Sequence, residues 1–143
     1  MTKIAQLHVI CGFFFIFSAA CAGAFLANDL TQAFAQRNSI LGTWTYTLLI
    51  SAHSHTNQFG ILHILFGLTY HWNALSPLWK LLQFIGMCLG SLAMSIFMVL
   101  RASTPPHMDW DILGLATGLC LSAALAAIGS HIFGLCLQMH SRH

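Results

Sequence analysis

Four histidines in one apolar segment are the side chains of this sequence best suited to chemistry. The segment begins at Ser51 and ends at His71, and its other histidines are His53, His55 and His63. Neutral imidazole is a good ligand for iron, copper and zinc, and an ionisable side chain inside a bilayer is costly unless it is paired or serves a function. The segment therefore predicts a metal or cofactor site inside a membrane.

The composition places the chain in a membrane. Of its 143 residues, 57% are hydrophobic and only 6% are charged, whereas a soluble domain carries about 25% charged residues. The net charge of +2 is too small to predict nucleic-acid binding. The five cysteines form neither a CxxC pair nor a CxxCH motif, so the sequence indicates neither a zinc knuckle nor covalently attached haem, and we expect these cysteines to serve packing.

Four windows of about 20 mainly apolar residues are long enough to cross a bilayer. They cover residues 6–27, 44–70, 78–100 and 112–139. Pro77 is placed to open the third helix in its first turn, and Pro105-Pro106 cannot continue that helix. The sequence therefore predicts an all-α integral membrane four-helix bundle that forms a single domain.

The polar segments predict an extra helix and an orientation. Residues 28–38 separate the first two windows and contain two apolar residues one turn apart, which predicts a short helix lying at the interface. Lys3, Lys80 and Arg142 fall at the end shared by both termini. The positive-inside rule then places both termini in the cytoplasm, as for a protein of the bacterial inner membrane. We interpret the first window as a retained span and not as a cleaved signal peptide.

Tryptophans and glycines agree with this arrangement. Near the predicted helix ends, where an aromatic belt is expected, stand Trp44, Trp72, Trp79 and Trp110. Close helix packing is predicted by two Gly-xxx-Gly steps, at Gly86 and Gly90 and at Gly114 and Gly118.

Three windows bring a histidine to a similar depth. With each window centred and a rise of about 1.5 Å per residue, His63 lies about 7 Å from the midplane toward the termini, His131 about 9 Å and His8 about 12 Å. His63 and His131 are therefore the axial ligand pair that depth favours. His55 lies just beyond the midplane, near the level of Met94, which is a candidate second ligand for it.

The second window is predicted to be central to the bundle. On a helical wheel, one face combines histidines, an amide and glycines, namely His53, Asn57, Gly60, Ile64, Gly67 and His71. The opposite face holds His55, Phe59, Leu62, Phe66 and Tyr70, and His63 is closer to that side. With histidines on both faces, this helix is expected to be surrounded by protein, and its glycines and aromatic rings are suited to a flat macrocycle.

The triplet His55-Thr56-Asn57, followed by Phe-Gly and then by Phe66-Gly67, resembles the second-helix signature of the haem-copper oxidase superfamily, in its nitric oxide reductase and cbb3-type branches. In those families the histidine of the triplet ligates a low-spin haem b, which implies the same role for His55. The pattern His-x-His near a glycine, at His53 and His55, is also similar to small four-helix membrane proteins of uncharacterised families related to that superfamily. The likeness covers about one helix, and the chain lacks the twelve-helix core and the paired histidines of the copper site. The resemblance therefore implies haem binding and no oxygen or nitric oxide reductase activity.

The first hypothesis is a membrane b-type haem protein that transfers electrons with a quinone or a redox partner protein, or that senses a diatomic gas. The candidate metal ligands are His55, His63 and His131. Further candidate cofactor-binding residues are His8, His53 and Asn57, the last as a group that orients an imidazole. The remaining histidines, His107, His140 and His143, are expected to be solvated.

Two alternatives stay open. Copper is favoured by His53 and His55 together with thioether and thiol groups, since these soft ligands suit Cu(I); the methionines concerned are Met87, Met94 and Met98. The other alternative is a structural subunit without a cofactor, whose histidines form hydrogen bonds between helices. A chain of this size is expected to contact membrane lipid and to associate with partners or further copies, and the sequence indicates no particular reaction.

Overall fold

A computed structural model describes residues 1–106 and 111–141. Its elements, in chain order, are α1 (Lys3–Ala35), α2 (Trp44–Thr69), the 3-10 turn η1 (Tyr70–Trp72), α3 (Pro77–Leu92), the π-helical segment η2 (Ala93–Phe97), α4 (Met98–Ala102) and α5 (Ile112–His140). Because α3, η2 and α4 form one continuous rod from Pro77 to Ala102, the predicted all-α four-helix architecture is confirmed.

The helices begin where the sequence supplies caps. The side chains of Thr2, Thr43 and Asp111 accept hydrogen bonds from main-chain N–H groups in the first turns of α1, α2 and α5, and Pro77 opens α3. Such caps satisfy donors that have no partner within the helix. Three of the four predicted windows therefore lie within a helix whose start can be read in the sequence, and the window 44–70 passes the end of α2 by one residue, Tyr70.

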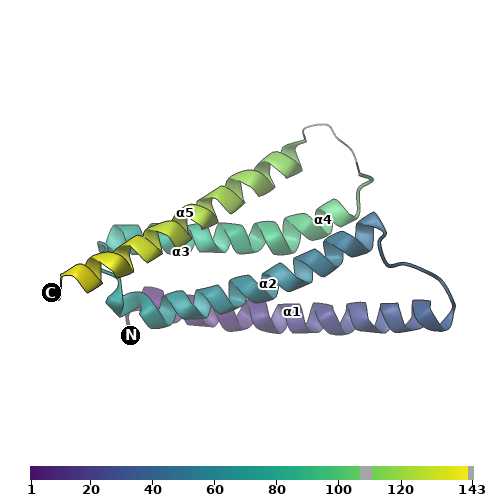
Figure 1. Ribbon diagram of the computed structural model, residues 1–143, viewed down its shortest axis with the longest axis horizontal. Coiled ribbons are helices and arrows are strands. Elements are labelled where there is room, and N and C mark those ends of the chain that lie inside the picture. Colours follow the sequence, from purple (N-terminus) through teal and green to yellow (C-terminus); the bar gives the residue numbers. More distant parts are fainter. Residues whose placement is uncertain (107–110, 142–143) are drawn as a thin grey trace.

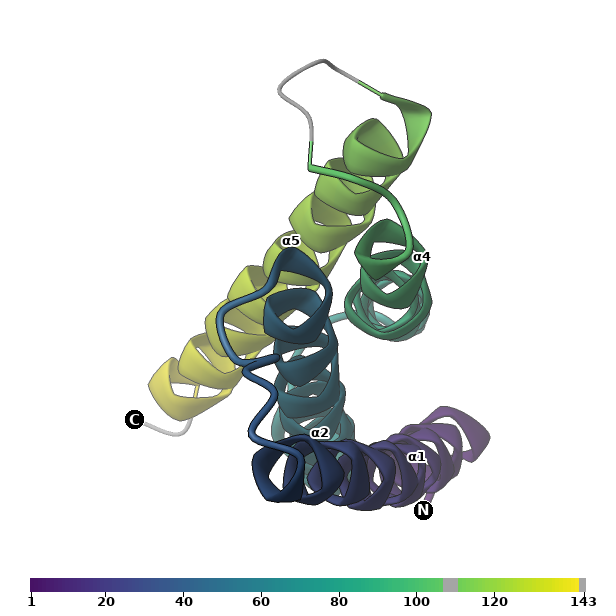
Figure 2. The same ribbon diagram turned by 90° about the vertical axis from the view of Figure 1, so that its right-hand side faces the viewer.

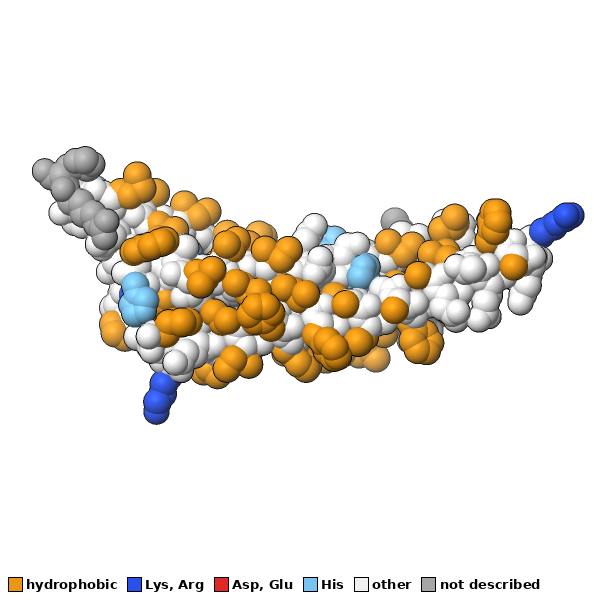
Figure 3. Space-filling model, turned by 90° about the horizontal axis from the view of Figure 1, so that it is seen from below, with side chains coloured by type: hydrophobic (Ala, Val, Ile, Leu, Met, Phe, Trp, Pro, Cys, Tyr) orange, Lys and Arg blue, Asp and Glu red, His pale blue; other side chains and the backbone are white. Residues whose placement is uncertain are grey.

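Three of the helical rods are long and apolar enough to cross a membrane: α1, Pro77–Ala102 and α5. The remaining helix, α2, is 26 residues long, but it is not apolar enough to be counted with these three. Its histidines, serines and threonines lower its mean hydropathy. Large apolar side chains lie exposed along the bundle. Phe25 and Ile112, for example, are 75% and 87% exposed. In Figure 3 hydrophobic side chains cover the middle of the visible face and the basic side chains lie at its ends. This surface is suited to lipid.

The rods are arranged as two layers with both termini at one end (Figure 1). α1 and α2 lie side by side, and α2 also packs against α3, η2 and α4. Figure 2 shows α5 crossing the bundle obliquely, so that its first half diverges from the other helices. The predicted central position of α2 is therefore observed.

Glycines bring α1 and α2 into main-chain contact. A Cβ atom built on Gly12 would lie 2.6 Å from the carbonyl oxygen of Gly60, and one built on Gly67 would lie 2.7 Å from that of Ala5. The glycine face of α2 is thus filled by α1 and leaves no space there for a macrocycle, contrary to the use that the wheel suggested.

The two Gly-xxx-Gly steps behave differently. Gly86 and Gly90 lie against α5, where a Cβ on Gly86 would approach the carbonyl oxygen of Ala123 to 2.7 Å. Gly118 has no atom within 4 Å of such a Cβ, because the first half of α5 diverges from the bundle. The predicted packing step at Gly114 and Gly118 is therefore wrong within the described chain.

The predicted interfacial helix at 28–38 is also wrong. α1 continues without a break to Ala35, is capped at Gln36, and ends as Arg37 adopts a positive φ of 55°. No Gly or Pro interrupts the sequence between Gly23 and Gly42, so nothing in the backbone chemistry stops the helix at the membrane surface. The polar residues extend α1 out of the apolar region instead.

Gly60→Ala should destabilise the protein, because the added Cβ would lie 2.7 Å from Cγ1 of Ile16 and 2.8 Å from the main-chain oxygen of Gly12. Overpacking of this kind costs about 1–3 kcal/mol. Gly118→Ala is the matched control, since it adds the same methyl group to a helix in open space. Thermal unfolding in detergent, monitored by the reaction of the half-buried thiols of Cys11 and Cys88 with a thiol-reactive dye, should give a lower midpoint for Gly60→Ala only. Equal midpoints would contradict the close contact of α1 and α2.

Candidate functional site

His8 of α1 and His63 of α2 form a buried pair of imidazoles. Their Nδ1 atoms lie 3.0 Å apart, and the side chains are 2% and 0% exposed. One proton is shared between these two nitrogens, so in the neutral pair one ring is protonated on Nδ1 and the other on Nε2. The contact therefore couples the tautomers of the two histidines.

Aromatic rings enclose this pair. Phe84 of α3 meets both imidazoles edge-on, with centroid separations of 5.0 Å from His8 and 6.1 Å from His63. Phe15 lies 5.6 Å from His63, and Phe66 lies 5.4 Å from His8. Such a dry environment strengthens the hydrogen bond inside it and raises the cost of any polar atom left without a partner.

Nε2 of His63 is such an atom. It has no hydrogen-bond partner, alone among the buried side-chain nitrogen and oxygen atoms of residues 1–106 and 111–141. The main-chain carbonyl of Met87 interacts with this imidazole, but it does not meet the geometry of a hydrogen bond to Nε2, and it accepts the hydroxyl of Ser91 at 2.9 Å. Because an unsatisfied buried polar atom costs about 1–3 kcal/mol, a ligand at Nε2 would remove a real penalty.

His131 of α5 has the opposite character, since both of its ring nitrogens are occupied. The hydroxyl of Thr69 donates to the Leu65 carbonyl at 2.6 Å, so its oxygen accepts from Nε2 of His131 at 2.8 Å. Nδ1 of His131 is then unprotonated and accepts from the amide of Asn73 at 2.9 Å. In the other tautomer Nδ1 would donate to Oε1 of Gln83, which lies 3.2 Å away, so both ring nitrogens have partners in either tautomer.

The network extends to α3. Asn73 also donates to Oε1 of Gln83 at 3.3 Å, and the amide nitrogen of Gln83 donates to the hydroxyl of Ser130 at 3.0 Å. The ring of His131 stacks on Phe66, with centroids 3.9 Å apart and planes inclined by 20°. Phe66 thus touches both His8 and His131, and the three predicted helices do bring His8, His63 and His131 to one region.

His53 and His55 each anchor Nδ1 on a main-chain carbonyl. Nδ1 of His53 donates to Ala19 on α1 at 2.8 Å, and Nδ1 of His55 donates to Ser51 at 2.8 Å. In both rings Nε2 consequently carries the lone pair, which is the form of histidine that binds metals. The group that orients His53 is therefore a carbonyl, while Asn57 lies half-buried one turn further along α2.

Sequence reasoning missed Thr69, Asn73 and Gln83. Asn73 follows the end of α2 and reads as part of a loop, yet it is only 3% exposed, as is Gln83. Gln83 was the available signal in the sequence, because an amide inside the apolar window 78–100 is expected to be buried and then needs hydrogen-bond partners. Its partner on α5 is set by tertiary packing alone.

The other candidate ligands do not gather around a common point. Met87 and Met94 pack in the hydrophobic core with Phe59, and His71 and His140 are exposed. His107 and His143 lie outside the described residues. In the part of the chain that the structure describes, no group of three His, Cys, Asp or Glu side chains is close enough to hold a metal ion.

Comparison of the chain with protein-family models, with curated proteins and with solved structures finds no match. The likeness of the His55-Thr56-Asn57 segment to the haem-copper oxidase superfamily thus stays a prediction from that motif.

Thr69→Val should destabilise the bundle by about 1–3 kcal/mol, because it leaves the Nε2 proton of His131 without an acceptor. The matched control is Thr47→Val, where the lost hydroxyl makes the same kind of bond to a carbonyl four residues earlier, at 2.8 Å, on an exposed surface. Thermal or denaturant unfolding in detergent should separate the two variants. If both lose the same small amount of stability, the His131 network does not hold α2 and α5 together.

Proposed function

We propose that the protein is a membrane b-type haem protein in which Nε2 of His63 is the axial ligand of the iron and His8 orients that imidazole. The observation that carries this proposal is the buried Nε2 of His63 that lacks a partner among the described residues. A ligating histidine usually donates its other ring N–H to a nearby acceptor, which fixes the tautomer and ring orientation. Nδ1 of His8, at 3.0 Å from Nδ1 of His63, is suited to that role.

The donor set supports haem over a bare metal ion. A structural zinc site needs about four protein ligands and a catalytic one about three, and no such group exists within residues 1–106 and 111–141. Haem iron is already held by its macrocycle and needs from the protein only an axial ligand such as a histidine. A single available imidazole nitrogen therefore fits haem.

The surroundings restrict where the macrocycle fits. α1 and α2 are in main-chain contact through Gly12 and Gly60, so that side of His63 is closed. α2 meets α3 at this level through the side chain of Phe84 and through the Met87 segment. A haem on Nε2 therefore requires α3 to move outward from α2, with Phe84 as an aromatic wall.

The ligand count supports an open coordination position. His131 has both ring nitrogens in hydrogen bonds, so it is not available to pair with His63 unless that network breaks. Such a haem supplies a one-electron redox couple and a position for a diatomic gas. The proposed role is accordingly electron transfer with a quinone or a redox partner protein, or gas sensing.

The proposed location is the bacterial inner membrane with both termini in the cytoplasm. Lys3 and Lys80 lie at the helix starts next to the termini, whereas Arg37 follows α1 and Arg101 lies in the last turn of α4, at the opposite end. The positive-inside rule supports this orientation by a margin of one basic residue, since Arg142 of the sequence adds to Lys3 and Lys80.

Copper is the second candidate, and the imidazole pair favours it. Metal–nitrogen bonds of about 2.0 Å would place the two Nδ1 atoms about 4 Å apart, about 1 Å more than observed. Copper binding between them therefore requires the two rings to separate. The thiols of Cys11 and Cys88 also face one another, one turn further along α1 and α3, and soft ligands favour Cu(I).

His63→Gln should abolish haem binding, because it removes the proposed ligand while it keeps a polar side chain. The measurement is a pyridine haemochrome assay per mole of detergent-purified protein, with copper analysis of the same sample. His131→Gln should retain haem with a lower unfolding midpoint, and His71→Gln, at an exposed position, should change neither. His55→Gln tests the ligand implied by the family resemblance.

Four results would contradict the haem assignment to His63. Equal haem content in wild type and His63→Gln would exclude this ligand. Loss of haem in His55→Gln alone would move the site to His55. Stoichiometric copper without haem would favour the second candidate, and wild-type protein without either would leave a structural subunit.

A further inference from the structure

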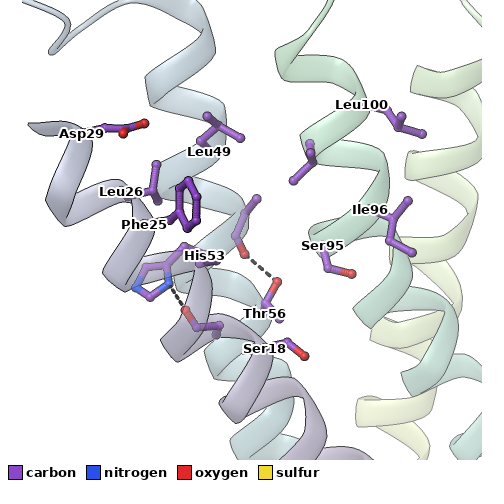
Figure 4. Close-up of a pocket in the computed structure, with 14 residues that line it drawn as sticks. Ser18, Phe25, Leu26, Asp29, Leu49, His53, Thr56, Ser95, Ile96 and Leu100 are labelled. Atoms are coloured by element: carbon purple, nitrogen blue, oxygen red, sulfur yellow. Dashed lines mark hydrogen bonds between the residues drawn. The ribbon is translucent and has the colours of Figure 1, made fainter.

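A second candidate site lies in a cavity further along α2, between α1 and the rod Pro77–Ala102 but nearer the end opposite the termini than His63 is. The cavity has a volume of about 500 Å³ and is lined by α1, α2, η2 and α4, within the range of about 300–1,000 Å³ that small-molecule sites occupy. α1 and α4 both pack on α2 and stand apart from each other across the cavity (Figure 4). Exposed apolar side chains of Phe25, Ile96 and Val99 form its rim, so the cavity opens toward lipid.

Three hydroxyl groups from three helical segments gather at one end of this cavity: Ser18, Thr56 and Ser95 (Figure 4). Each hydroxyl donates its proton to a carbonyl four residues earlier, at 2.8 Å for Ser18, 2.6 Å for Thr56 and 2.7 Å for Ser95. A hydroxyl whose proton is used in this way retains only acceptor lone pairs. The three oxygens therefore offer acceptors to the cavity and no donor.

The other polar groups that line the cavity have the same character. Nδ1 of His53 is already donated to Ala19, which leaves a lone pair on Nε2. At the opposite end, Asp29 is an acceptor and receives the hydroxyl of Tyr46 at 3.2 Å. A ligand that satisfies this lining has to donate hydrogen bonds.

The backbone at Ser95 is a second and independent observation. Ser95 stands in the π-helical segment Ala93–Phe97, the only such segment in the described residues. π-helical turns are rare and occur frequently at functional sites. This one interrupts an otherwise regular rod at the wall of the cavity.

We infer that the cavity binds the hydroquinone form of a lipid-soluble quinone, with its two ring hydroxyls donated to acceptors among Ser18, Thr56 and Ser95 and the tail leaving between α1 and α4. An oxidised quinone presents carbonyl acceptors, which this lining does not satisfy. The choice of a quinol over other hydroxyl lipids rests on the proposed electron-transfer function, and binding is tested without reference to haem.

The test measures binding of decylubiquinol, kept reduced under anaerobic conditions, to the full chain in phosphatidylcholine nanodiscs. The matched ligands are its dimethyl ether, which keeps the shape and lacks the donors, and dodecanol, which keeps one hydroxyl without the ring. Decylubiquinol should bind about tenfold more tightly than its ether, as expected for loss of one to two hydrogen bonds. Equal affinity of quinol and ether, or dodecanol as tight as the quinol, would overturn the inference.

Variants locate the site. Thr56→Val and Ser95→Ala should each weaken quinol binding about threefold to tenfold and leave binding of the ether unchanged. Ser122→Ala is the control, because this exposed hydroxyl on α5 makes the same kind of bond, to the Gly118 carbonyl at 2.9 Å, outside the cavity. Val99→Trp should block binding at the rim. Unchanged quinol binding in all three cavity variants would place the ligand elsewhere.

The two proposals fail separately. Haem content is unaffected by these cavity variants if both are correct, since none of the changed residues touches His63. Quinol binding by protein without haem would support this site and contradict the proposed function. Haem binding without quinol binding would support the proposed function and contradict this site.

Discussion

The demand for hydrogen-bond partners in an interior without water governs this structure. An apolar bundle in lipid has no solvent to satisfy an imidazole, an amide or a hydroxyl, and each such group left alone costs free energy. Serine and threonine hydroxyls satisfy this demand by donating to carbonyls of their own helix, as Thr56 does. The histidines differ, because their two nitrogens point in opposite directions and require two partners.

This requirement separates the two histidine environments. His131 meets it through Thr69 and Asn73, and its network connects α2, α3 and α5. His63 meets half of it through His8, although it is completely buried. The environment of His131 shows that this bundle can satisfy both nitrogens of a buried histidine. We therefore expect an external ligand at Nε2 of His63, which has no partner among the described residues. That contrast connects the packing of the bundle to the proposed function.

Much of the architecture was predictable from the sequence, and the partners of the histidines were not. Hydropathy, Pro77 and the capping threonines locate the helices because these signals are local. The end of α1 at Ala35 escaped prediction since a polar sequence without Gly or Pro remains compatible with a helix. The helical wheel assigns Gly60 to the wall of a macrocycle site, whereas α1 fills the space beside it, because the helix that approaches a glycine is set by tertiary packing. Likewise Asn73 and Gln83 meet His131 from positions distant in sequence, and helix depth alone does not show which nitrogen of a ring stays available.

The central claim is that Nε2 of His63, backed by His8, ligates haem iron and that His131 does not. The most direct measurement is the resonance Raman spectrum of the reduced protein, grown with and without ¹⁵N-histidine. A five-coordinate haem with an iron–histidine stretching band that shifts with the label, and that is absent in His63→Gln, would agree with the account. A six-coordinate low-spin spectrum that turns five-coordinate in His131→Gln would contradict it, because His131 would then be a ligand.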